Sequence, residues 1–101
     1  MNTVIDVFPT LSVITKIEVL SFNAPADDYQ LLVSFMDDSR IIDLNNQIVD
    51  RSIEIRKNYK TKLPDAIIAA TAVEYNLILI SRNTSDFKNI QGLEVINPHL
   101  F

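Results

Sequence analysis

The chain has 101 residues, 48% of them hydrophobic and 22% charged, which is enough apolar material for one folded domain over residues 1–101. Nine basic and thirteen acidic side chains give a net charge of −4, which argues against binding of nucleic acid through overall charge alone. Having no cysteine and one histidine excludes disulfides, thiolate zinc sites and multi-histidine sites. No apolar run approaches the roughly 20 residues of a membrane span, and no leader pattern is visible, so we expect a cytoplasmic protein without membrane association.

Strand and helix patterns alternate along the chain, which predicts an α/β fold with a largely parallel sheet and helices on both of its faces. Only one glycine is present, so turns must rely on other residues. Asn45 is expected to cap a helix, and Asn76 to end one in the left-handed conformation. In chain order, we expect strands at 11–14, 41–44, 77–80 and 93–96, and helices at 15–22, from Pro25, after Asn45, and from Pro64 to about Tyr75.

Apolar spacing predicts which faces of these elements are buried. The strand at 77–80 is apolar on both faces, as in a strand covered by helices on two sides. The helix from Pro25 should bury the stripe formed by Tyr29, Leu32, Val33 and Met36. The helix after Asn45 should bury Ile48, Val49, Ser52, Ile53 and Ile55.

Three carboxylates are expected in or near the first turns of helices. They are Glu18, three residues after Thr15, then Asp65, directly after Pro64, and Asp86, in the turn at 83–87. Glu18 and Asp86 each follow a strand, and the carboxyl ends of parallel strands share one edge of a sheet. Asp65 shares its helix face with apolar residues and should therefore point toward packed surface.

A purely local interpretation exists for each acid. Thr15 and Glu18 have the spacing of a capping box, and the helix dipole favours Asp65 and Asp86 by about 0.3–1 kcal/mol each. If all three met within about 5 Å, each pair would repel by about 3 kcal/mol at an effective dielectric constant of about 20. Such a cluster requires protons or a divalent cation, and all-oxygen ligands favour Mg²⁺ or Mn²⁺.

Three segments resemble the second, third and fourth acidic motifs of PIN domains, specifically the VapC toxins of type II toxin–antitoxin modules; they are Ser12–Phe22, Leu63–Ala72 and Leu79–Phe87. The resemblance covers about 11–101. It implies a PIN-like three-layer fold and an Mg²⁺- or Mn²⁺-dependent endoribonuclease that hydrolyses RNA, with a VapB-like antitoxin as partner. It further implies that Glu18, Asp65 and Asp86 are the catalytic, metal-binding acids. Polar support is implied at Thr15, Ser81 and Asn83, although the family often has another acid where Asn83 stands.

The family begins with a central strand that ends in Asp-Thr/Ser-Asn/Ser, and Met1–Thr10 contains no such motif. Thr3–Asp6 cannot supply that strand within one subunit, because a parallel crossover needs a dozen or more residues. Asp6 is therefore expected in a loop or helix tail. We expect an N-terminally truncated fold with two strands left about 9.6 Å apart. A homodimer would complete the sheet, and a domain swap is one way to form it. Loss of the first acid would weaken metal binding and activity.

Four of the nine basic residues precede Asp65 in the run from Arg56 to Lys62. Together with Arg82 they could hold an RNA backbone beside the acids, and Tyr59 could stack on a base. The other interpretation is a solvated helix end, where cations are favoured by the dipole. The RNA-binding candidates are Arg56, Lys57, Lys60, Lys62 and Arg82.

Two functions follow from the sequence. The first is a VapC-like nuclease, and the second is a non-catalytic PIN remnant that acts as a dimerisation or antitoxin-binding module. The first acidic motif distinguishes them, because an upstream strand that carried it would favour the enzyme.

Overall fold

The computed structural model describes residues 10–81, 84–87 and 89–97. It divides into two compact units, residues 1–43 and 44–101. None of the described helices is long and apolar enough to cross a membrane. The elements in chain order are β1 (Thr10–Ser12), α1 (Val13–Leu20), α2 (Ala26–Asp37), β2 (Arg40–Ile42), α3 (Asn46–Asn58), α4 (Leu63–Glu74), β3 (Ile78–Ile80), the 3₁₀ turn η1 (Thr84–Asp86) and β4 (Glu94–Ile96).

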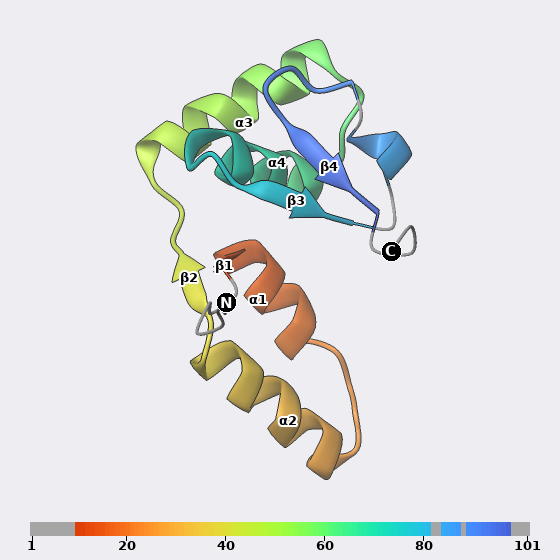
Figure 1. Ribbon diagram of the computed structural model, residues 1–101. Helices are drawn as coiled ribbons and strands as arrows, with labels where there is room; N and C mark the ends of the chain where they lie inside the picture. Colours follow the sequence, from red (N-terminus) through yellow and green to blue (C-terminus); the bar gives the residue numbers. More distant parts are fainter. Residues whose placement is uncertain (1–9, 82–83, 88, 98–101) are drawn as a thin grey trace, which may run out of the picture. The chain divides into compact units, whose positions relative to one another are not determined.

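In the first unit, β1 and β2 pair in parallel, with Thr10 opposite Arg40 and Ser12 opposite Ile42 (Figure 1). Ser12 ends the strand and caps α1, because its side chain accepts a hydrogen bond of 3.1 Å from the Ile14 N–H. The predicted strand end at residue 14 was therefore two residues too late.

The early start of α1 also changes the interpretation of Thr15 and Glu18. Thr15 lies inside the helix, and Glu18 lies in its second half, not in its first turn. The capping-box prediction was wrong, because Ser12 is the hydroxyl residue that caps this helix. Capping does not explain Glu18, because it lies beyond the first turn of α1; its side chain is exposed.

Helix α2 has apolar residues on two faces. The predicted inner stripe is confirmed, since Met36 is buried and the other three members are partly buried. The Tyr29 hydroxyl donates to the Leu20 carbonyl at 2.9 Å and so joins α2 to the end of α1. Leu31 and Phe35 lie on another face and remain 69% and 47% exposed.

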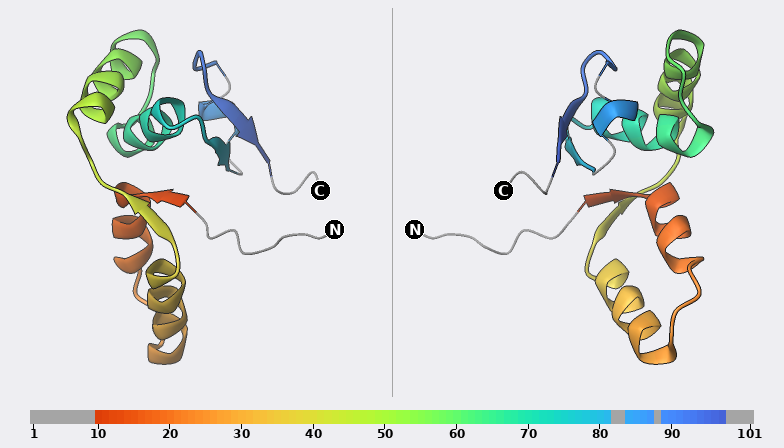
Figure 2. Two further views of the ribbon diagram at one scale, coloured as in Figure 1. Left: turned by 60° about the vertical axis from the view of Figure 1, so that its left-hand side comes forward. Right: turned by 90° about the vertical axis from the view of Figure 1, so that its right-hand side faces the viewer.

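In the second unit, α4 lies between α3 and the β3–β4 pair in both views of Figure 2. Its interior positions are small residues, which allow neighbouring elements to approach closely. A helix that is covered on several sides needs little amphipathic contrast, which explains its nearly continuous apolar sequence. The buried residues of α4 are Ala66, Ala69, Ala70, Thr71 and Ala72.

Asn45 caps α3 as predicted. Its Oδ1 accepts from the Ile48 N–H at 2.9 Å, and its Nδ2 donates to the Tyr75 hydroxyl at 2.9 Å. The second bond ties the start of α3 to the end of α4. The predicted inner face was partly wrong: Val49 and Ile53 are 37% and 54% exposed, whereas Ile48, Ser52 and Ile55 are buried.

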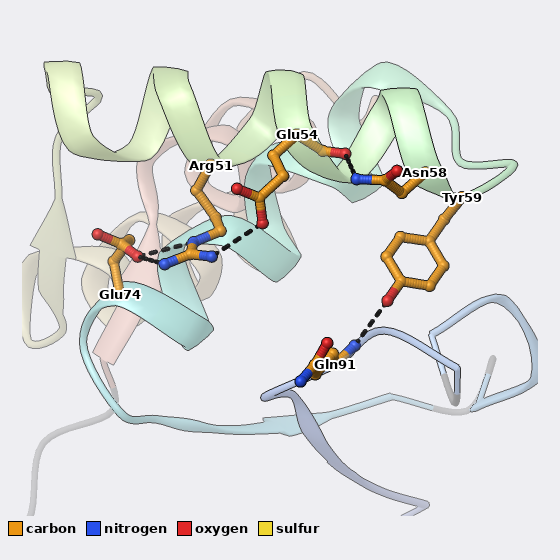
Figure 3. Close-up of polar contacts among 6 residues, drawn as sticks. All are labelled: Arg51, Glu54, Asn58, Tyr59, Glu74 and Gln91. Carbon is orange, nitrogen blue, oxygen red and sulfur yellow. Dashed lines mark hydrogen bonds and ion pairs between the residues drawn. The ribbon is translucent and has the colours of Figure 1, made fainter.

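Two further contacts hold α3 in place (Figure 3). Arg51 Nε and Nη2 both lie 2.8 Å from Glu74 Oε2, and hydrogen bonding to Glu74 raises the pKa of Arg51. At the end of α3, the Tyr59 hydroxyl accepts from the Gln91 N–H at 3.1 Å. Tyr59 therefore has a structural contact with the segment that precedes β4.

Strands β3 and β4 pair in parallel, from Ile78 opposite Glu94 to Ile80 opposite Ile96. Asn76 has φ 55° and confirms the predicted left-handed helix end. Ile78 and Ile80 are exposed, so the prediction of cover on both faces of this strand was wrong. The parallel α/β class is confirmed, but the described strands form two separate two-stranded sheets.

Candidate functional site

A cavity of about 350 Å³ lies in the second unit where α3 ends and α4 begins. We call it the site cavity. Its lining includes two of the predicted acids and three of the predicted cations, with one threonine that the sequence did not single out. The lining residues are Arg56, Lys60, Thr61, Lys62, Asp65 and Asp86.

Local structure explains how Asp65 reaches the cavity. Helix α3 ends at Asn58, and Lys62 caps α4 with a backbone carbonyl that accepts from the Ala66 N–H at 2.9 Å. Pro64 lies in the first turn of α4, where its missing N–H costs nothing. Asp65 is consequently half-buried in the first turn, where the positive end of the helix dipole stabilises its carboxylate.

Asp86 reaches the same cavity from the segment that follows β3. It is the last residue of η1, and the next residue, Phe87, is only 4% exposed. The Phe87 N–H donates to the Thr84 carbonyl at 3.1 Å and closes the turn. Burial of Phe87 thus anchors the turn that carries Asp86.

The site cavity combines both signs of charge. Two carboxylates and three basic side chains give the lining a formal charge of +1, in a chain of net charge −4. The cations reduce the repulsion between the carboxylates, and they provide donors for an anion such as a phosphate group. The arrangement can therefore bind a phosphate group beside two carboxylates.

The buried hydroxyl of Thr61 provides a test of whether a metal ion fits. Its Oγ1 makes no hydrogen bond to any residue that the structure describes, although it is buried. Such an unsatisfied group costs about 1–3 kcal/mol unless a ligand completes it. Together with the two carboxylates it gives three oxygen donors, the ligand type that Mg²⁺ and Mn²⁺ prefer, so the residues fit such an ion. No sequence signal selects Thr61, because it resembles any surface threonine in a basic run.

The other predicted site residues have different positions. Glu18 is exposed and Thr15 half-buried, and both lie on α1 in the first unit. Ser81 is half-buried, and its N–H donates to the Ile96 carbonyl at 3.0 Å. Lys57 lines a separate, mainly apolar groove. Arg82 and Asn83 lie outside the described residues, as does the predicted position of Asp6.

The structure brings Asp65 and Asp86 to one cavity. That Glu18 joins them as a third metal-binding acid stays a prediction. Within either unit, the described residues contain no group of three or more acidic or histidine side chains suited to hold a metal ion. The second unit by itself therefore supplies two of the three acids that the sequence suggested.

A model of the PIN domain family matches residues 9–93. The chain is 40% identical over 57 residues to Ribonuclease VapC2 of Methanocaldococcus jannaschii, a match that covers 56% of this chain and 38% of the relative. A toxin–antitoxin complex from Klebsiella pneumoniae contains a chain with 41% identity and a TM-score of 0.74, over 86% of this chain and 71% of that one. DNA-bound VapBC from Salmonella typhimurium shares the fold, with a TM-score of 0.76 at 21% identity, over 86% and 73% of the two chains.

The unsatisfied hydroxyl predicts opposite effects on stability and ligand binding. Thr61→Val removes a buried group without a partner among the described residues, so the free energy of unfolding should rise by about 1 kcal/mol in the absence of ligand. The same change should weaken Mn²⁺ binding, because one oxygen donor is lost. Urea denaturation and calorimetry measure the two effects, with Thr61→Ser as the matched control that keeps the hydroxyl. A Thr61→Val protein of unchanged stability and unchanged Mn²⁺ affinity would contradict the assignment.

Proposed function

The chain belongs to the PIN domain family, and on this basis we propose that it is a VapC-like endoribonuclease that hydrolyses RNA with Mg²⁺ or Mn²⁺. The observation that carries the proposal is the site cavity, where Asp65 and Asp86 lie among three basic side chains. Stabilisation of helix starts is a local effect and does not require the two acids to line the same cavity. The match covers 38% of the curated ribonuclease, so the activity of that whole protein is a proposal for this chain.

Each residue of the proposed site has a defined task. Asp65 and Asp86 hold the metal ion, with Glu18 as the third acid, and Thr15, Ser81 and Asn83 provide polar support. A bound divalent ion would supply an activated water and stabilise the charge that develops on the phosphoryl group. The protein's own contribution is to fix the carboxylates, and the burial of Ala66 next to Asp65 limits the movement of that backbone.

The basic side chains are proposed to bind the RNA backbone. Arg56, Lys60 and Lys62 line the site cavity and can each contact a phosphate. Lys57 and Arg82 extend this surface in the proposal. Tyr59 is not included, because its hydroxyl contacts Gln91 and its side chain lines a different cavity. Cellular RNA as substrate would place the activity in the cytoplasm.

We further propose a VapB-like antitoxin as the protein partner. Solved structures similar to this chain include a toxin–antitoxin complex, whose matched chain is 41% identical to it over the aligned part, and VapBC complexes. An antitoxin that covered the site cavity would have to match a surface with net positive charge.

A second candidate function is a non-catalytic PIN remnant that binds an antitoxin or a second copy. It is favoured by one observation, the presence of only two carboxylates among the described residues of a cavity with three cations. This lining attracts a divalent cation less than an all-acidic site would, which favours a binding role over metal-dependent catalysis.

Replacement of the half-buried acid tests the metal site. Asp65→Asn should lower the Mn²⁺ affinity by at least about tenfold, because even indirect changes around metal ligands cost about 10–100-fold. It should also abolish Mn²⁺-dependent cleavage of an RNA substrate. Calorimetry measures the affinity, and Asp50→Asn, an exposed acid of α3 outside the site cavity, is the control. Equal heats for wild type and Asp65→Asn would reject the metal site.

The basic lining predicts a measurable salt dependence of RNA binding. Lys60→Gln combined with Lys62→Gln removes two phosphate contacts, so the slope of log K against log salt should fall by about 1.4 in magnitude. Fluorescence anisotropy with labelled single-stranded RNA measures the slope. Arg40→Gln, an exposed basic residue at the start of β2, should leave it unchanged. An unchanged slope in the double variant would show that RNA does not contact these lysines.

We also propose a homodimer. Each unit contains a sheet of only two described strands, and an isolated pair of parallel strands is at best marginally stable in water. Ile78 and Ile80 expose apolar surface on β3. Light scattering coupled to chromatography should give a mass of twice 11.5 kDa, whereas a monomer at micromolar and higher concentrations would reject the dimer.

A further inference from the structure

Helices α3 and α4 form an open groove of about 440 Å³ on the second unit. We call it the α3–α4 groove. Its apolar residues include pairs spaced by four positions on each helix, so each pair lies along one helix face. These pairs are Val49 with Ile53 on α3, and Leu63 with Ile67 on α4; Arg56 and Lys57 lie at the C-terminal end of α3.

Most of the apolar side chains that line this groove are exposed and do not belong to the core of the second unit. Helix α3 already buries Ile48, Ser52 and Ile55 against its neighbours, whereas Ile53 and Leu63 are 54% and 53% exposed. Several large apolar side chains that are exposed together mark a surface that another molecule covers. Two facing rows with helical spacing fit the apolar face of a helix.

Charge restricts what can occupy the groove. Arg56 and Lys57 are the charged groups among the described residues that line it, so the lining is basic in a chain of net charge −4. A partner that brought its own copy of this groove would place cations against apolar side chains without a carboxylate to pair with. The fitting occupant is therefore an acidic helix with an exposed apolar face.

Helix α2 has this character. Asp27, Leu31 and Phe35 follow one another at intervals of four and share one face, with Asp28 beside them. Leu31 and Phe35 are exposed, and α2 contains three acids and no basic residue. Its apolar pair and its acids complement the apolar rows and the cations of the α3–α4 groove.

We propose that α2 of one copy docks in the α3–α4 groove of a second copy, and that the second copy's α2 docks reciprocally in the first. This inference rests on the proposed homodimer and names its interface. A two-fold arrangement of this kind is closed, so it gives a dimer and not a filament. It also covers exposed apolar residues of both units, Leu31 and Phe35 in the first and Ile53 and Leu63 in the second.

Mixing two charge-reversed chains tests the reciprocal contact. The first carries Asp27→Lys and Asp28→Lys, and the second carries Arg56→Glu and Lys57→Glu. Alone, each places like charges against each other across both contacts, so its dimer dissociation constant should rise by about 10–100-fold. In an equimolar mixture, the mixed dimer has one contact that pairs the two reversed surfaces and one that pairs the two unchanged surfaces. Both contacts then join opposite charges, so a dimer with one chain of each kind should form with near wild-type affinity.

Native mass spectrometry distinguishes the mixed dimer by its mass, and analytical ultracentrifugation gives the dissociation constants. Circular dichroism checks that each variant is folded, since reversed charges at helix ends reduce stability. An apolar pair of variants provides a second readout. Leu31→Ser should weaken the dimer, whereas Phe22→Ser, an exposed aromatic residue outside α2 and the groove, should not.

The outcomes separate this inference from the proposals on which it rests. A wild-type dimer that neither charge-reversed pair nor Leu31→Ser weakens would overturn the interface and leave the homodimer standing. Variants that weaken the dimer but do not form a mixed dimer would show that the charges do not meet between copies, which would also overturn the interface. A monomeric wild type would overturn the homodimer itself. Because every readout is a mass or a dissociation constant, the result is the same whether or not the chain cleaves RNA.

Discussion

The close packing of α4 is the constraint on which the second unit depends. Ala66, Ala69 and Ala70 are fully buried, and their small side chains let α3 and the β3–β4 pair approach the helix from opposite sides. In such packing a shift of the helix produces overlap on one side and a cavity on the other, and both are destabilising. The first turn of α4 is therefore fixed by its own core contacts. Asp65 directly precedes Ala66, so this packing fixes its backbone position. A hydrogen bond from the Asp65 side chain is not needed for this.

The lining of the site cavity carries both positive and negative charges, which act differently on a metal ion and on a phosphate group. The carboxylates of Asp65 and Asp86 would repel each other, and the neighbouring cations reduce that cost, but the same cations oppose a divalent ion. A phosphate group changes this balance, because it neutralises the cations and adds oxygen ligands. Metal and RNA should consequently raise each other's affinity in the proposed site. This coupling would strengthen the contribution of Asp65 and Asp86 to the proposed metal site.

Sequence reasoning succeeded where a local rule decides the structure. Asn45 caps α3 and Asn76 adopts a left-handed conformation because each depends on its immediate neighbours. It failed at α1, where Ser12 and Thr15 could both cap a helix and only the position of β1 selects the first. It also placed Ile53 in the core, since helical periodicity cannot distinguish a core face from an exposed apolar face. Thr61 was missed because burial of its hydroxyl arises from the connection between two helices, which no pattern encodes.

Arg56 joins the two proposed surfaces, because it lines both the site cavity and the α3–α4 groove. A carboxylate of a docked α2 that paired with Arg56 would remove one of the three cations and reduce the formal charge of the cavity lining from +1 to 0. Phosphate binding and docking would then compete for the same guanidinium group, and linkage requires that each weaken the other equally. Lys60 and Lys62 do not line the groove and would keep their contribution to phosphate binding. The coupling between assembly and RNA binding would therefore be carried by Arg56, together with Lys57, which lines the groove and extends the proposed RNA-binding surface. Its size is bounded by what two phosphate contacts contribute.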